Sequence, residues 1–135
     1  MKRVFKIMLA ALFLTGCGLI SGPNPSDSSQ QSKDYRQINM DEAIAIMNSQ
    51  SGYIILDVRR VDEFSAGHIP GAINIPNESI GNEEISALPD KDQLILVYCR
   101  SGNRSKTASQ ALAEMGYTNV YEFGGITTWE YEITR

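Results

Sequence analysis

The stretch LILVYCRSGNRSK, residues 94–106, joins an apolar run to a loop that is rich in positive charge. The apolar run is rich in β-branched and aliphatic residues and ends at Cys99, which predicts a buried strand. Gly102 permits the positive φ that a curled loop needs, and apolar residues then recur at helical spacing. The stretch therefore predicts a strand, a tight loop and a helix that begins near Arg104 or Ser105.

The segments on either side continue this alternation of strands and helices. Asn39 and Glu42 form a capping-box pattern, which predicts the start of a helix that ends at Gly52. The predicted strands are YIILDV, AINIP, QLILVYC and NVYEF, residues 53–58, 72–76, 93–99 and 119–123.

The remaining segments carry weaker signals. RRVDEFSAGHIPGAINIP, residues 59–76, is broken by Gly and Pro and predicts irregular structure outside its one short strand. NESIGNEEISAL, residues 77–88, has weak helical character, and GGITTWEYEI, residues 124–133, predicts a turn followed by a helical segment. Because strands alternate with helices, we expect a single α/β domain with a mainly parallel central sheet flanked by helices.

Cys99 occupies the position where parallel sheets place ligands, beyond the carboxyl end of a strand. The thiolate is the nucleophilic form of cysteine, and a helix N-terminus with nearby cations lowers the pKa of a thiol. Backbone N–H groups of the loop can point at an anion, and Arg100 and Arg104 add forked donors suited to oxyanions. The pattern indicates a nucleophile for displacement on a small anionic substrate. The alternative is a buried structural cysteine followed by a solvated basic turn.

The first sixteen residues predict a secretory signal, with a basic start, MKRVFK, and an apolar run, IMLAALFLTG. The apolar run is about half the ~20 residues that a membrane-spanning helix needs. LTGC, residues 14–17, resembles the bacterial lipobox, which implies cleavage before Cys17 and a diacylglycerol on its sulfur. The alternative is an ordinary signal peptide that is cleaved nearby, with Cys17 incidental.

Residues 17–34 predict a lipidated terminus followed by a flexible tether, because the segment is rich in Ser, Pro, Gly, Asn and Gln. Residues 35–135 predict one globular domain. We therefore expect the protein to be exported and held by lipid at a bacterial membrane, on its periplasmic or extracellular face. If Cys17 carries lipid, Cys99 has no intramolecular cysteine partner, which points to reactivity rather than a structural role.

The charge balance argues against nucleic acid as a partner. The chain has 12 basic and 16 acidic side chains. Three of the basic ones, Lys2, Arg3 and Lys6, lie in the predicted signal peptide, so nine remain against the 16 acidic ones, a net charge of −7. An acidic protein is poorly suited to bind a phosphate backbone.

Three blocks, in order, resemble the rhodanese domain family and together span most of the chain after the predicted tether. YIILDVRRVDEFSAGHIPGAINIP is similar to the family's first conserved block, VYCRSGNRS to its active-site loop, and EFGGITTWE to its Gly-Gly and Trp segment. The resemblance implies a rhodanese-like α/β fold in which the active-site loop lies between a strand and a helix N-terminus.

The resemblance also implies a sulfurtransferase. Cys99 would take the outer sulfur of thiosulfate or a similar donor as a persulfide and pass it to a thiol or to cyanide. The implied partners are a small anionic sulfur donor and a thiol or protein acceptor; neither a metal nor an organic cofactor is implied, and we expect a monomer. The residues expected to bind the donor are Arg100, Ser101, Gly102, Asn103, Arg104 and Ser105.

Four residues of the first block are expected to support the site. Asp57 and Arg59 are expected to form a salt-bridged brace for nearby loops, with direct substrate contact as the alternative. Glu63 is expected to accept a structural hydrogen bond. His68 is expected to be structural, because it lies in the turn-forming block GHIPGA and because the loop can activate Cys99 without it. The alternative is a catalytic base.

Two other functions remain open. The related phosphatases carry an Arg six positions after the Cys, where this chain has Ser105, while Arg104 stands five positions after Cys99. This shorter loop favours sulfur over the larger group that a phosphatase or arsenate reductase handles. The second alternative is a persulfide carrier without turnover, or a thiol redox-sensing module for a protein partner, which would have the same loop.

Overall fold

A computed structural model describes residues 34–135 of the protein. The predicted signal peptide, residues 1–16, lies outside the described residues. So do Cys17 and the predicted tether as far as residue 33. The interpretations of these segments therefore stay predictions.

A five-stranded sheet forms the centre of the domain, in the order β1-β5-β4-β2-β3. Every neighbouring pair of strands in it runs parallel. The strands are β1 (Arg36–Gln37), β2 (Ile54–Asp57), β3 (Ile73–Asn74), β4 (Ile95–Cys99) and β5 (Val120–Gly125). The predicted α/β fold with a parallel central sheet is confirmed.

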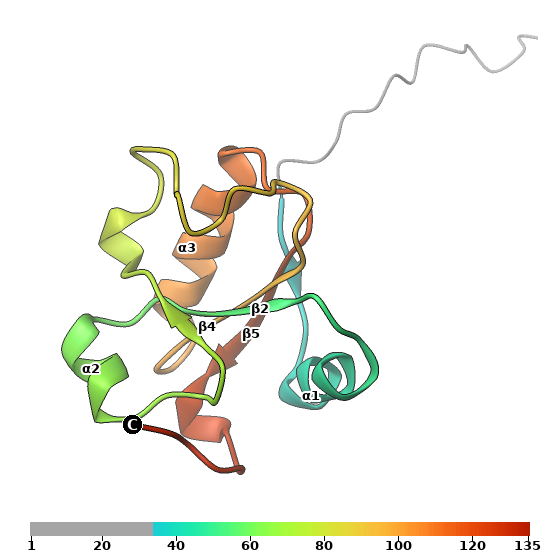
Figure 1. Cartoon of the computed structure of the whole chain (residues 1–135), viewed down its shortest axis with the longest axis vertical. Coiled ribbons are helices and arrows are strands. Elements are labelled where there is room, and N and C mark those ends of the chain that lie inside the picture. The colour runs from blue at the N-terminus through green and yellow to red at the C-terminus, as the bar shows by residue number, and fades with distance from the viewer. Residues whose placement is uncertain (1–33) are drawn as a thin grey trace, which may run out of the picture. The chain divides into compact units, whose positions relative to one another are not determined.

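Helices cover both faces of this sheet (Figure 1). On one face, Ala108 and Leu112 pack against Val97 of β4. On the other face, Ala43 packs in a separate cluster with Leu96 of β4. The helical elements are α1 (Met40–Ser49), α2 (Val61–Ala66), α3 (Asn103–Glu114) and two 3-10 turns, η1 (Asn77–Ser79) and η2 (Ile126–Thr128). Alternate residues of β4 therefore serve the cores on its two faces.

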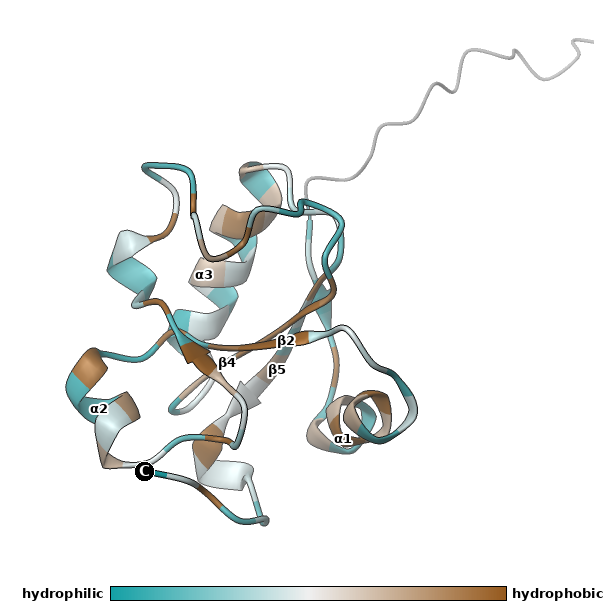
Figure 2. Ribbon diagram, in the orientation of Figure 1, coloured by the Kyte–Doolittle hydropathy of each residue, from teal (hydrophilic) through white to brown (hydrophobic). Residues whose placement is uncertain are grey.

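The central strand β4 carries the predicted nucleophile at its carboxyl end. All five of its residues are buried, as expected for a strand that is covered on both faces. Figure 2 shows hydrophobic colour along β2 in the middle of the fold and hydrophilic colour on several of the outer loops. No helix among residues 34–135 has both the length and the apolar character to cross a bilayer.

The predicted capping box at the start of α1 is confirmed. The Glu42 N–H donates to Asn39 Oδ1 at 2.9 Å, and the Asn39 N–H donates to Glu42 Oε2 at 2.8 Å. The helix ends at Ser49, slightly earlier than the predicted end at Gly52.

Three elements differ from the predictions. α2 forms within the segment predicted to be irregular, where the Arg60 N–H donates to Glu63 Oε2 at 3.1 Å across its first turn. Residues 77–88 form only the turn η1, so the weak helical prediction there is wrong. β1 was not predicted, because two residues are too few for a recognisable pattern, and it forms only by pairing with β5.

Candidate active site

The loop after β4 runs from Cys99 to Asn103, the first residue of α3. The helix thus begins one or two residues before its predicted start near Arg104 or Ser105. Gly102 has a φ of 109°, a left-handed conformation that residues with side chains rarely adopt. A Cβ at Gly102 would also touch Gly124 Cα at 3.6 Å. Glycine therefore allows the turn that brings the loop N–H groups back toward the end of β4.

The thiol of Cys99 lies at the bottom of this loop and is 1% exposed. Its Sγ accepts a hydrogen bond from the Gly102 N–H at 3.0 Å and lies 3.4 Å from Ser105 Oγ. Burial raises the pKa of the thiol. Hydrogen bonding with the Ser105 side chain, together with hydrogen bonds from the N–H groups of Ser105, Gly102 and Ser101, outweighs burial and holds that pKa below its ordinary value. The site is therefore built to hold a buried thiolate.

The Gly-Gly pair at the end of β5 lets the loop pack closely against the sheet. A Cβ on Gly125 would clash with the Arg100 carbonyl oxygen and the Ser101 nitrogen, so the position has room only for glycine. The same carbonyl oxygen accepts hydrogen bonds from the Thr127 N–H at 3.3 Å and the Thr127 hydroxyl at 3.1 Å. β5 and η2 together fix the first peptide of the loop.

Arg104, in the first turn of α3, is paired with Glu63 of α2. Its Nη1 donates to Glu63 Oε2 at 2.7 Å, and its Nη2 donates to Oε1 at 3.0 Å. The hydrogen bond from Arg104 is the main reason that the pKa of Glu63 falls to about 2, and the same bond raises the pKa of Arg104. Sequence reasoning treated Arg104 as a substrate donor and Glu63 as a separate acceptor. In the structure both Nη1 and Nη2 of Arg104 already donate to Glu63.

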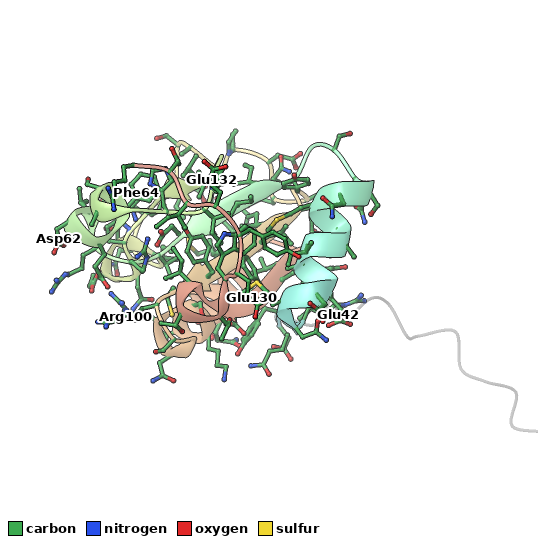
Figure 3. All side chains as sticks on the ribbon, turned by 90° about the horizontal axis from the view of Figure 1, so that it is seen from below. Glu42, Asp62, Phe64, Arg100, Glu130 and Glu132 are labelled. Atoms are coloured by element: carbon green, nitrogen blue, oxygen red, sulfur yellow. The ribbon has the colours of Figure 1, made fainter. Side chains whose placement is uncertain are left out.

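Arg100 is an exposed cation directly after the thiol. Its guanidinium has no hydrogen-bond or ion-pair partner within the part of the chain that the structure describes. Figure 3 shows Arg100 at the margin of the molecule, on the same side as Asp62 of α2. Ser101 and Asn103 are exposed as well. The outer side of the loop is therefore polar and positively charged.

Asp57 and Arg59 form a buried ion pair beside β4, with 2.7 Å between Arg59 Nη2 and Asp57 Oδ2. The Tyr98 hydroxyl donates to the same carboxylate at 2.7 Å, and Arg59 donates to the Gly67 carbonyl at 2.7 Å. Burial acts to lower the pKa of Arg59, but its bonds to Asp57 raise that pKa overall. Side chains of adjacent strand residues point to opposite faces. This network therefore holds the end of β4 from the face opposite Cys99.

His68 makes its contacts away from the thiol. Its Nδ1 lies 2.9 Å from the Phe64 carbonyl oxygen, and its ring stacks on the Phe64 ring at 3.7 Å. Its backbone pairs with Thr134 in an isolated antiparallel bridge. Within residues 34–135, no group of three or more His, Cys, Asp or Glu side chains is arranged to hold a metal ion.

Glu122 of β5 was missed by sequence reasoning. It is 3% exposed, and its Oε1 accepts hydrogen bonds from Ser105 Oγ at 2.6 Å and from the Gly124 N–H at 2.8 Å. The available signal was an acidic residue in the middle of the predicted strand NVYEF. Strand alternation places it on the same face as Val120, which packs with the α3 cluster.

The fold and this loop match a known protein family. Residues 39–132 match the model of the Rhodanese-like domain family. The chain belongs to this family and is a rhodanese-type enzyme.

Two relatives named as thiosulfate sulfurtransferases are similar to the chain over most of their own length. It is 41% identical over 71 residues to thiosulfate sulfurtransferase PspE of Escherichia coli (strain K12), covering 53% of this chain and 68% of PspE. It is 33% identical over 97 residues to thiosulfate sulfurtransferase GlpE of Pseudomonas entomophila (strain L48), covering 71% of this chain and 85% of GlpE. A solved structure of an E. coli rhodanese with anions superimposes with a TM-score of 0.56 at 35% identity, covering 62% of this chain and 98% of that one.

Proposed function

We propose that the protein transfers sulfane sulfur through a persulfide on Cys99, with thiosulfate or a similar anion as donor. In the first step the thiolate attacks the outer sulfur of the donor. A new S–S bond forms, the donor's S–S bond breaks, and sulfite leaves with the bonding electron pair. In the second step a thiolate or cyanide attacks the terminal sulfur, and the Cys99 thiolate leaves. No metal or organic cofactor takes part.

The hydrogen bonding of Cys99 is the observation that carries this proposal. A thiol that is 1% exposed would ordinarily resist ionisation, yet the Gly102 N–H at 3.0 Å and the neighbouring loop donors lower its pKa. The names of PspE and GlpE support thiosulfate as the donor. The anions in the E. coli rhodanese structure support a site for small anions.

Donor binding falls mainly to the loop N–H groups and to Arg100. Arg100 is exposed and unpaired among the described residues, so its five guanidinium donors are available to an oxyanion. Arg104 adds positive charge but is engaged by Glu63. The spacing of Cys99 and Arg104 leaves a loop that favours sulfur over a phosphoryl or arsenate group.

The proposed sulfur acceptor is a thiol or a protein persulfide acceptor at a membrane surface. Lipid on Cys17 would hold the exported, monomeric domain there, and the segment up to residue 34 would connect the two as a flexible tether. The lipobox-like LTGC, behind a basic and an apolar segment, supports this location.

Steady-state turnover tests the proposal. The purified full chain is incubated with thiosulfate and cyanide, and both sulfite and thiocyanate are measured, with Cys99→Ser as the control. We expect continuous formation of both products by the native chain only. A single equivalent of sulfur on Cys99 without turnover would instead support a persulfide carrier. Hydrolysis of a phosphate monoester would support a phosphatase.

A further inference from the structure

A continuous row of contacts beneath the loop links Cys99, Ser105 and Glu122. Cys99 Sγ lies 3.4 Å from Ser105 Oγ, which lies 2.6 Å from Glu122 Oε1. The three residues are buried, at 1%, 0% and 3% exposure. They come from β4, α3 and β5, so the packing of three elements sets their alignment.

The Ser105 hydroxyl has one proton, and this fixes the direction of the hydrogen bonds that link Cys99, Ser105 and Glu122. Its shortest contact is with the Glu122 carboxylate, and its other two partners, the Gly102 and Gly124 carbonyl oxygens at 2.9 and 3.3 Å, are also acceptors. While Ser105 donates to Glu122, its oxygen is able to accept the proton of the Cys99 S–H group. The geometry thus suits proton movement from sulfur toward the carboxylate.

Charge explains why such movement is needed. If Cys99 ionised while Glu122 stayed ionised, the interior would hold two anions that are only two hydrogen bonds apart. The cations on neighbouring elements are engaged or solvated. Arg104 of α3 is held by α2, Lys106 of α3 is exposed, and Arg36 of β1 lies over an aromatic ring. If Cys99 and Glu122 keep one proton between them, the interior holds one negative charge rather than two.

We infer that in the free protein Cys99 and Glu122 share one proton through Ser105, so that each group holds it part of the time, and that Glu122 holds it while sulfur is bound and transferred. The S–H bond breaks and its electron pair stays on sulfur. That proton bonds to Ser105 Oγ, whose own proton passes to Glu122 Oε1. The products are a thiolate, a hydroxyl and a carboxylic acid, and the total charge is unchanged.

Glu122 is thus a positioning residue that acts on Cys99 through Ser105. Its role deepens the proposed function and rests on it. Thiosulfate brings two negative charges and sulfite removes two, so the persulfide carries the single charge that the thiolate had. The proton can therefore stay on Glu122 through both transfer steps.

The pH titration of Cys99 tests the shared proton without any sulfur donor, so this inference and the proposed function can fail separately. Thiolate formation is followed by ultraviolet absorbance, as the difference between each full-length protein and its Cys99→Ser counterpart. In the native chain we expect two steps separated by more than about 1 pH unit, as for two strongly interacting groups. In Glu122→Gln we expect one step, at a lower pH than the upper native step, because the competing charge is gone.

Ser109→Ala is the matched control, because Ser109 is another buried α3 hydroxyl and has no hydrogen-bond partner among the described residues. It should keep the two-step titration of the native chain. Two unchanged steps in Glu122→Gln would overturn the inference. If Glu122→Gln fails to fold, the native chain decides alone: two steps support the shared proton, and a single step overturns it.

Discussion

Cys99 shows how single hydrogen bonds reverse the effect of burial. Burial alone favours the neutral thiol, but hydrogen bonding with the Ser105 side chain and hydrogen bonds from the loop backbone lower the pKa of Cys99. The loop achieves this without a histidine, since His68 contacts Phe64 and Thr134 instead. The reactivity of the residue therefore comes from the Ser105 hydroxyl and the peptide groups around it.

Arg100 is expected to bind the donor. Arg100→Ala should lower kcat/KM for thiosulfate by about 10- to 150-fold, because a hydrogen bond to a charged group contributes roughly 1.5 to 3 kcal/mol. Arg100→Lys should recover only part of the loss, because a point charge replaces a fork. Lys106→Ala serves as the control, because it removes a different exposed cation, which lies on α3. Equal, small effects of Arg100→Ala and Lys106→Ala in steady-state kinetics would contradict the assignment.

Arg104 and Glu63 should make stability depend on acidity. Arg104 lowers the pKa of Glu63 from 4.5 to about 2. The pair therefore stabilises the fold at pH values above the pKa that Glu63 has in the unfolded chain. That contribution is lost as the pH falls from 4.5 toward 2. Arg104→Ala should destabilise the protein by about 1–3 kcal/mol at neutral pH and remove this acid dependence. Denaturant unfolding at several pH values measures both effects, and an unchanged acid dependence would show that the pair does not act this way.

At the scale of elements, β5 and the loop meet at a position with no room for a side chain. Gly125→Ala should displace the Arg100 peptide and reduce sulfur transfer at least tenfold, since small misplacements of reacting groups cost about 100-fold in rate. Gly116→Ala, at a glycine with open space and a φ of 96°, is the control. It should cost about 1–2 kcal/mol of stability and leave turnover unchanged. Full activity in a folded Gly125→Ala protein would contradict the close packing.

Local patterns predicted those elements whose residues are periodic or uniformly apolar. The buried strand before Cys99, the capped helix α1 and the helix after the loop belong to this group. α2 is only six residues long and β1 only two, so neither shows a period. The pairing of Arg104 with Glu63 joins residues 41 positions apart. Glu122 becomes part of the site only when β5 packs beside α3, which no local pattern reveals.

At the scale of the whole molecule, lipid on Cys17 is expected to anchor the protein. Two or more acyl chains give stable membrane attachment, whereas one gives marginal binding. Cys17→Ala should block both lipidation and cleavage, so the uncleaved segment IMLAALFLTG would remain. Mass spectrometry of the N-terminus of the native protein measures the outcome. An unmodified terminus after residue 17, with the protein in the soluble fraction, would contradict the anchor.

The persulfide on Cys99 is the central claim, and peptide mass spectrometry tests it most directly. The full chain is treated with thiosulfate, digested without reductant and compared with an untreated sample and with Cys99→Ser. We predict that the peptide containing Cys99 gains the mass of one sulfur atom, and that added cyanide or thiol removes it with equal formation of the sulfur-bearing product. A Cys99 peptide of unchanged mass, in a protein that still turns over thiosulfate, would contradict the account.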